Sequence, residues 1–256
     1  SDFDPGANDD LYYYDEVNDT WKNYKSGSFD FEKGKGYLCA YQIGATKSFT
    51  GTINNASVLV DNLTITGGGV SEDGWNLVGN PYCSAITWSN LWGTDIVATA
   101  KTYPGTGNYL DIDPGDAIPS AQGFFIQVSN ATSMTIPTTA RVHSTNSWQK
   151  IENREFETLK LKISGGSNTF SDICRVRFIE EATEAFDSQY DSHKLFGQAS
   201  APQLFTDIGD ELLSTNTYAN SDIERELKLN FIPGTSGEFT IEVVENSILS
   251  NKKVYL

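Results

Sequence analysis

Short segments in which hydrophobic and polar residues alternate are the feature that most constrains how this chain folds. They are rich in valine, isoleucine, threonine and aromatic residues, and clusters of glycine, asparagine, aspartate and proline separate them. A period of two is typical of strands that bury one face. In the first half of the chain it predicts strands at 11–14, 36–43, 48–53, 57–65, 75–78, 123–128 and 133–136.

The second half alternates more regularly and predicts strands at 157–163, 172–178, 224–231 and 238–244. Lysine, arginine and glutamate occupy the polar positions of these strands, so we expect one face of each sheet to be exposed to solvent. Residues 180–186 form the only plausible helix, about two turns long. The polar stretch 144–156 separates the halves. We therefore predict an all-β chain with two antiparallel β-sandwich domains in tandem, jelly-roll-like over residues 1–150 and immunoglobulin-like over residues 151–256.

Charge and hydropathy exclude several classes of partner. The 256 residues carry a formal charge of −16, which phosphate backbones and anionic lipids would repel. No run approaches the roughly 18 apolar residues of a membrane-spanning helix. We expect neither nucleic-acid binding nor membrane insertion. The polar, acidic start of the chain does not resemble a signal peptide, so we interpret it as a mature or excised piece.

A series of motifs runs through nearly the whole chain. The first half carries Trp21, GKGYL (34–38), FTGT (49–52), GWNLVGNPY (74–82), QGFF (122–125) and RVH (141–143). The second half carries LKL (159–161), Phe178, AT (182–183), FD (186–187), YD (190–191), KL (194–195) and VYL (254–256). Their order resembles a module of large secreted Bacteroidetes proteins that lies just upstream of the type IX secretion sorting domain. The resemblance implies an extracellular or outer cell-surface location, although Cys83 stands where the family often has a second proline, and the sorting domain is not within these residues.

The same motifs have a structural interpretation that needs no family. Gly34, Gly36, Gly79 and Gly123 permit positive φ or close backbone approach where strands begin. Trp75, Leu77 and Trp88 provide the large buried area that a sandwich core requires. On this interpretation the motifs explain folding and leave the binding partner open.

The sequence offers little catalytic chemistry. His143 and His193 are the only histidines, and the chain has no His-Glu-x-x-His, Gly-x-Ser-x-Gly or phosphate-binding glycine loop. A triad of His193 with Asp187 or Asp191 lacks a serine in a nucleophile's context. Carboxylates are numerous enough for a glycosidase pair, but no acidic triplet marks one. We predict that the chain is not an enzyme.

Calcium is the one cofactor that the sequence suggests. Asp111, Asp113 and Asp116 surround a Pro-Gly turn, and calcium prefers clustered oxygens in such loops. Asp2, Asp4, Asn8, Asp9 and Asp10 form a second acidic group. The alternative for both is an aspartate-rich turn in solvent.

Aromatic residues in loops suggest a second kind of site. Trp92, Tyr103 and Tyr109, with Trp148 as a further candidate, stand beside asparagine and aspartate and would offer sugars a stacking surface. For Trp92 the alternative is a clasp over the core.

Three cysteines are too few and too scattered for a disulfide scaffold or a zinc site. We interpret Cys39, Cys83 and Cys174 as small buried hydrophobic residues. Pairing of Cys39 with Cys83, which would leave Cys174 as a buried thiol, stays open.

Together these features predict a non-catalytic, secreted or cell-surface adhesin or stalk module of a type IX cargo protein, which acts by presentation, adhesion or assembly. Its partner would be an extracellular glycan or protein surface. The main alternative is a carbohydrate-binding module, with or without calcium, of a secreted polysaccharide-degrading protein. An inactive remnant of a hydrolase and self-association through edge strands are further possibilities.

Overall fold

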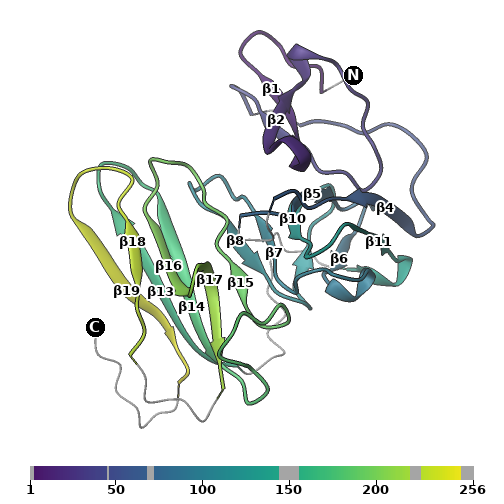
Figure 1. The fold of residues 1–256 in the computed structure, drawn as a ribbon. Coiled ribbons are helices and arrows are strands. Elements are labelled where there is room, and N and C mark those ends of the chain that lie inside the picture. Colours follow the sequence, from purple (N-terminus) through teal and green to yellow (C-terminus); the bar gives the residue numbers. More distant parts are fainter. Residues whose placement is uncertain (1–2, 45, 68–71, 144–155, 220–225, 249–256) are drawn as a thin grey trace. The chain divides into compact units, whose positions relative to one another are not determined.

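The structure, a computed structural model, describes residues 3–44, 46–67, 72–143, 156–219 and 226–248 (Figure 1). The chain is all-β with several antiparallel sheets, as predicted. Helix in these ranges is limited to the 3-10 turns η1 (Glu16–Asn18), η2 (Tyr24–Ser26), η3 (Asn90–Trp92) and η4 (Thr138–Ala140). The described residues contain no helix that could span a membrane.

The chain divides into two compact units. Unit 1 comprises Ser1–Gly69, Asp73–Ala100 and Asp113–Ile151, and unit 2 comprises Val70–Glu72, Lys101–Ile112 and Glu152–Leu256. The expected domain boundary at 150/151 lies outside the described residues. Unit 2 takes in residues 101–112, a segment that sequence reasoning assigned to the first domain.

Unit 1 is built from small antiparallel sheets. In one sheet β1 pairs with both β2 and β3, in a second β5 pairs with β10, in a third β4 pairs with β11, and in a fourth β6 pairs with both β9 and β12. The strands are β1 (Asp10–Asp15), β2 (Thr20–Asn23), β3 (Leu38–Ala40), β4 (Val58–Leu63), β5 (Trp75–Gly79), β6 (Ala85–Thr87), β9 (Ala117–Ile118), β10 (Gly123–Gln127), β11 (Thr132–Ile136) and β12 (Arg141–Val142).

Backbone contact between two of the glycine motifs holds part of unit 1 together. The Gly36 amide donates to the carbonyl of Leu77, and the Gly79 amide donates to the carbonyl of Gly34. A Cβ on Gly36 would lie 2.5 Å from the Val78 oxygen, and one on Gly79 would lie 2.7 Å from the Lys35 oxygen. Only glycine permits this approach, which confirms the structural interpretation of these positions.

The Asn-Pro-Tyr segment of the long motif is also structural. Asn80 is buried, and its amide donates to the carbonyls of Ser84 and Pro119. The buried Tyr82 hydroxyl donates to the carbonyl of Ile136. Each side chain thereby satisfies backbone carbonyls that burial would otherwise leave unpaired.

Unit 2 is dominated by one sheet of seven strands (Figure 1). Its order is β18-β16-β17-β14-β13-β19, and β15 also pairs with β17. The strands are β13 (Glu157–Gly165), β14 (Ser171–Phe178), β15 (Ser192–His193), β16 (Gln203–Ile208), β17 (Glu211–Tyr218), β18 (Asn230–Ile232) and β19 (Phe239–Asn246). Two further strands, β7 (Ala100–Thr102) and β8 (Leu110–Ile112), pair with each other and supply residues 101–112 of the unit.

The large sheet folds over its own core. The core contains Leu161, Ile163, Val176 and Leu204 from β13, β14 and β16. Phe231 of β18 and Phe239 of β19 have ring centroids 5.1 Å apart, so the two edges of the sheet approach each other. Self-association through these edge strands stays a prediction.

One pairing departs from the antiparallel expectation. β14 and β17 are parallel, with Arg175 opposite Thr215 and Phe178 opposite Tyr218. Parallel neighbours need a long connection. The chain provides one because β15 and β16 lie between them in sequence.

The predicted segments fared unequally. The structure has strands in all of the expected segments except 48–53, and at 224–231 only the end of the described part belongs to β18. In 48–53, Phe49 and Ile53 are 65% and 67% exposed. The alternation of hydrophobic and polar residues there goes with neither a buried face nor strand pairing. The helix expected at 180–186 is wrong, since the segment forms turns and bends. Two helical turns are too short to persist without strong packing.

Candidate functional site

The most unusual chemistry in the described residues is a group of charged side chains buried in unit 2. We call Lys101, Asp111, Asp172, Arg175 and Lys194 the charged cluster. Lys101 comes from β7, Asp111 from β8, Asp172 and Arg175 from β14, and Lys194 directly follows β15. All but Asp111 are at most 5% exposed, and the Asp111 side chain is 8% exposed. Charges are buried at this depth only when they are paired.

Asp111 is the acceptor at the centre of one half of the cluster. Its Oδ1 lies 2.5 Å from Lys101 Nζ, and its Oδ2 lies 2.5 Å from an Arg175 guanidinium nitrogen. The Thr215 hydroxyl also donates to Oδ2, at 2.7 Å. Lys101 Nζ in turn donates to the hydroxyls of Ser192 and Ser214, at 2.7 and 2.6 Å.

These contacts keep Asp111 ionised. Burial alone would raise the pKa of Asp111, but the charges of Lys101 and Arg175 and the hydrogen bonds to the carboxylate lower it below its ordinary value. Burial lowers the pKa of Lys101 to about 8, against the attraction of Asp111. Two cations around one carboxylate leave a net positive charge, which favours the carboxylate form most strongly.

The other half of the cluster is a pair. Lys194 Nζ lies 2.5 Å from Asp172 Oδ2, and both side chains are 1% exposed. The Leu204 amide donates to the same carboxylate oxygen, at 2.6 Å. Asp172 Oδ1 is buried without a hydrogen-bond partner in the described structure. Burial raises the pKa of Asp172, although Lys194 and the Leu204 amide favour its ionised form.

A cysteine lies beside both halves of the cluster. Cys174, two residues after Asp172 on β14, is a buried free thiol, and the charges of Lys194, Asp172, Asp111 and Arg175 all act on it. Burial raises its pKa to about 12. The thiolate, which is the nucleophile and metal ligand, is therefore absent near neutral pH. Cys39 and Cys83 are free and exposed, so the interpretation of three buried cysteines holds only for Cys174.

The histidine considered for a triad is also buried. The His193 ring stacks on Phe186 with centroids 3.9 Å apart, and its Nε2 lies 3.0 Å from Glu211 Oε2. Burial, with the nearby charge of Lys101, lowers the pKa of His193 to about 3.

The aspartates near this histidine form a structural corner. The Asp191 carboxylate accepts from the amides of Asp187 and Thr217, both at 2.7 Å. Burial raises the pKa of Asp191 to about 6. Its hydrogen bonds tie the loop before β15 to β17.

The three aspartates proposed for calcium separate into different environments. Asp111 belongs to the charged cluster, whereas Asp113 and Asp116 lie in unit 1, where Asp116 Oδ2 accepts from the Asp113 amide at 2.9 Å. Of the second acidic group, Asp10 accepts from Asn23 and lies 3.2 Å from Lys25. The described ranges hold no group of three or more histidine, cysteine, aspartate or glutamate side chains placed to hold a metal. Calcium binding stays a prediction.

The aromatic candidates also fall in both units. Trp92 is half-buried in unit 1, with its ring edge-to-face on buried Trp88 at 5.2 Å, the clasp arrangement. In unit 2, Tyr103 and Tyr109 form a half-buried pair with centroids 5.3 Å apart. The exposed Gln198 amide donates to the Tyr103 hydroxyl at 2.6 Å. Trp148 lies outside the described residues.

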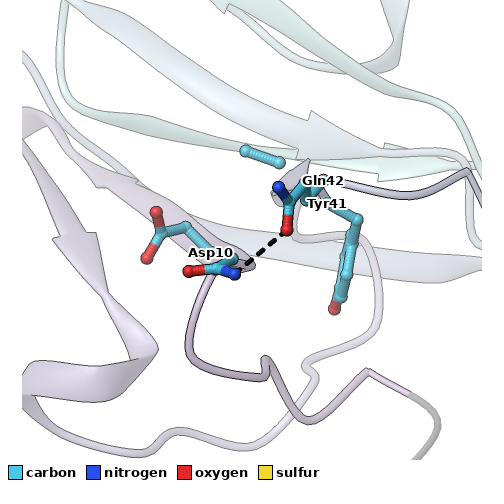
Figure 2. Close-up of a pocket in the computed structure, with 5 residues that line it drawn as sticks. Asp10, Tyr41 and Gln42 are labelled. Carbon is cyan, nitrogen blue, oxygen red and sulfur yellow. Dashed lines mark hydrogen bonds between the residues drawn. The ribbon is translucent and has the colours of Figure 1, made fainter.

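A polar hollow opens at the start of β1 and the end of β3 (Figure 2). Asn8, Asp10, Ala40, Tyr41 and Gln42 line it. The Asn8 amide donates to Gln42 Oε1 at 3.0 Å, and this hydrogen bond is the dashed line in Figure 2. The hollow thus presents amides, a carboxylate and one aromatic ring together.

Sequence reasoning missed most of the charged cluster. Arg175 was placed on a wet face, but it and Arg177 are 5% exposed, so that expectation is wrong for β14. It holds for β13, where half-buried Lys160 and Lys162 lie 3.6 and 3.5 Å from glutamates of β19. A signal was present in Lys101, which stands among small and β-branched residues in a segment with no other charge nearby.

Comparison of the chain with family models, with curated proteins and with solved structures gives no match, so no family is assigned.

Proposed function

We propose that the chain is a non-catalytic module of a secreted or cell-surface protein, which presents binding surfaces to an extracellular glycan or protein. The observation that carries this proposal is the placement of the charged cluster. The side chains with the most perturbed chemistry are inside unit 2, paired with one another and out of reach of a substrate.

Catalysis requires a reacting group that touches its substrate within a cleft. Lys101 and Lys194 are each 1–2% exposed and already engaged by carboxylates. Their contacts join β7, β8, β14 and the segment after β15. We infer that these groups stabilise the unit, and that function belongs to its surfaces.

A substrate panel combined with a binding array tests this proposal. The 256-residue chain should capture particular glycans or extracellular-matrix proteins and leave polysaccharide, ester, peptide and phosphate substrates unchanged. Turnover that disappears in Asp111→Asn or His193→Gln, in variants that remain folded by circular dichroism, would overturn it. Fractionation of the producing cells, with the protein detected by antibody, tests the location. If the protein is exported, it should be found in the medium or on the outer cell surface.

Carbohydrate binding is the second candidate, and the polar hollow favours it. Amide, carboxylate and tyrosine side chains are the groups that hydrogen-bond and stack on sugars. Asp10 is ionised there, since the hydrogen bond from Asn23 and the charge of Lys25 lower its pKa. We propose a glycan site at Tyr41 and Gln42, a location that differs from the loop aromatics.

Two exposed glutamines distinguish the possible sites. Gln42 lines the hollow, whereas Gln198 contacts Tyr103 of the aromatic pair. On a glycan array, Gln42→Ala should weaken binding at least several-fold and Gln198→Ala should not. The reverse result would move the site to Tyr103 and Tyr109, and loss only in Trp92→Ala would move it to Trp92. If the wild type binds no glycan on the array, the proposed partner is a protein.

A further inference from the structure

The Asp172–Lys194 pair brings an amine and a carboxyl group into contact inside unit 2. An amine nitrogen lies 2.5 Å from a carboxyl oxygen, with both side chains 1% exposed. An ordinary buried ion pair survives only when hydrogen bonds satisfy its remaining lone pairs and protons. In this one Asp172 Oδ1 is buried without a partner of good hydrogen-bond geometry, although the Ile173 amide acts on the carboxyl group.

We propose that Lys194 and Asp172 condense to an amide, giving unit 2 an intramolecular isopeptide cross-link. In the dry interior the ammonium proton passes to the carboxylate, so that a neutral amine faces a neutral carboxyl group. The Lys194 nitrogen attacks the Asp172 carbonyl carbon, and the C–N bond forms. The C–OH bond breaks, and the hydroxyl leaves with an amine proton as water. One water molecule is released, and no oxidant, reductant or cofactor is needed.

The surroundings favour the neutral pair that this step requires. Burial penalises charged forms, and transfer of a proton within the pair removes both charges at once. Burial raises the pKa of Asp172, in the direction of the electrophilic acid. The carbonyl carbon of an acid accepts a nucleophile more readily than that of a carboxylate.

The neighbouring pair provides a comparison within the same unit. Lys101 Nζ and Asp111 Oδ1 are also 2.5 Å apart. However, Arg175 and the Thr215 hydroxyl stabilise Asp111 as the carboxylate, and the pKa of Asp111 is lowered. A carboxylate held this way is a poor electrophile. We therefore assign the cross-link to Asp172 and Lys194 and leave Lys101 with Asp111 as an ion pair.

The cross-link would join β14 to the segment that follows β15, 22 residues later. The Lys194 amide already donates to the Leu212 carbonyl of β17, so backbone pairing holds that segment in place. Since the side chains are almost fully excluded from solvent, water has little access to hydrolyse the amide.

Intact mass spectrometry of the denatured wild type tests the proposal directly. The mass should be lower than the sequence mass by one water molecule, and tryptic digestion should yield a branched peptide joining residues 172 and 194. Trypsin should cleave after Lys101 in the same digest, which is the internal control. The full sequence mass in protein that circular dichroism shows to be folded would overturn the proposal, as would a branch at Lys101.

Variants add a second readout. Lys194→Arg retains the positive charge but does not form this amide, so it should have the full sequence mass, as should Asp172→Ala. The control variant Lys162→Arg changes a half-buried lysine of the same sheet, whose ion pair with Glu242 is 3.5 Å long, and should still be lighter by one water. A mass deficit that persists in Lys194→Arg would overturn the assignment. Because the wild-type mass decides the matter alone, a variant that fails to fold does not affect the test.

Discussion

Replacement of Asp111 by asparagine tests whether the charged cluster forms as described. The substitution retains the size of the side chain but removes the negative charge that faces Lys101 and Arg175. Lys101 and Arg175, with side chains 1% and 6% exposed, would then repel each other without a counter-ion. Loss of one partner from a buried pair typically costs about 3–5 kcal/mol.

Release of its proton limits the share of this cost that comes from Lys101, whereas Arg175 stays charged. An unfolded lysine has a pKa of about 10.4, so deprotonation at pH 7 costs about 4.6 kcal/mol at 1.36 kcal/mol per pKa unit. We therefore expect Asp111→Asn to lower the unfolding free energy of unit 2 by about 3–5 kcal/mol. For a unit of this size that corresponds to a fall in Tm of roughly 10–20 °C.

Urea unfolding followed by far-UV circular dichroism measures the effect. Tryptophan fluorescence is unsuitable, since four of the five tryptophans, Trp21, Trp75, Trp88 and Trp92, belong to unit 1. The matched control is Glu242→Gln, which removes a carboxylate that is 50% exposed and 3.5 Å from Lys162. Exposed pairs contribute about 0.2–1 kcal/mol, so the control should change little. A loss below about 1 kcal/mol for Asp111→Asn would refute the reasoning, because it would mean that Asp111 is solvated.

Three further predictions follow from the same structure. Gly79→Ala should destabilise unit 1 by about 2 kcal/mol or more through its clash with the Lys35 carbonyl, whereas Gly51→Ala, with open space around it, should be nearly neutral in the same urea titration. The pKa of His193 is lowered to about 3, so below pH 6.5 the unfolded chain binds more protons than the folded chain. The unfolding free energy of the wild type relative to His193→Phe should therefore fall by about 1 kcal/mol for each pH unit between pH 6 and pH 4. A difference that does not change with pH would contradict the burial of His193. If calcium binds at the predicted aspartates, it should raise the urea midpoint and Asp116→Ala should abolish that rise; a midpoint that calcium leaves unchanged would contradict the site.

Local pattern predicted strands such as β13, whose burial alternates, and it missed β17, whose buried residues are largely polar. β13 reads as a strand because Leu159, Leu161 and Ile163 all enter the core. β17 contains Ser-Thr-Asn-Thr at 214–217, which resembles a loop, yet these residues are at most 6% exposed. Hydrogen bonds from distant segments make their burial tolerable, as when the Asp191 carboxylate accepts from the Thr217 amide. Contacts with such distant partners produce no pattern in the local sequence.

The charged cluster was out of reach of sequence reasoning for the same cause. Asp111 stood out as an acid beside a Pro-Gly turn, and this suggested a cation. Its actual cations are side chains, one of them from Arg175, 64 residues along the chain. Pairing at that separation depends on the tertiary contact between β8 and β14, about which periodicity carries no information.

The register between β13 and β19 has a mechanical consequence. Leu159 lies opposite Asn246, near the start of one strand and the end of the other, so the chain enters and leaves the large sheet at one end. Tension applied through residues 157 and 246 would break the rungs between these strands one after another, from that end, instead of loading them all together. Unit 2 should therefore resist tension poorly when it is pulled through residues 157 and 246. It is better suited to a position beside a force-bearing chain than to one within it.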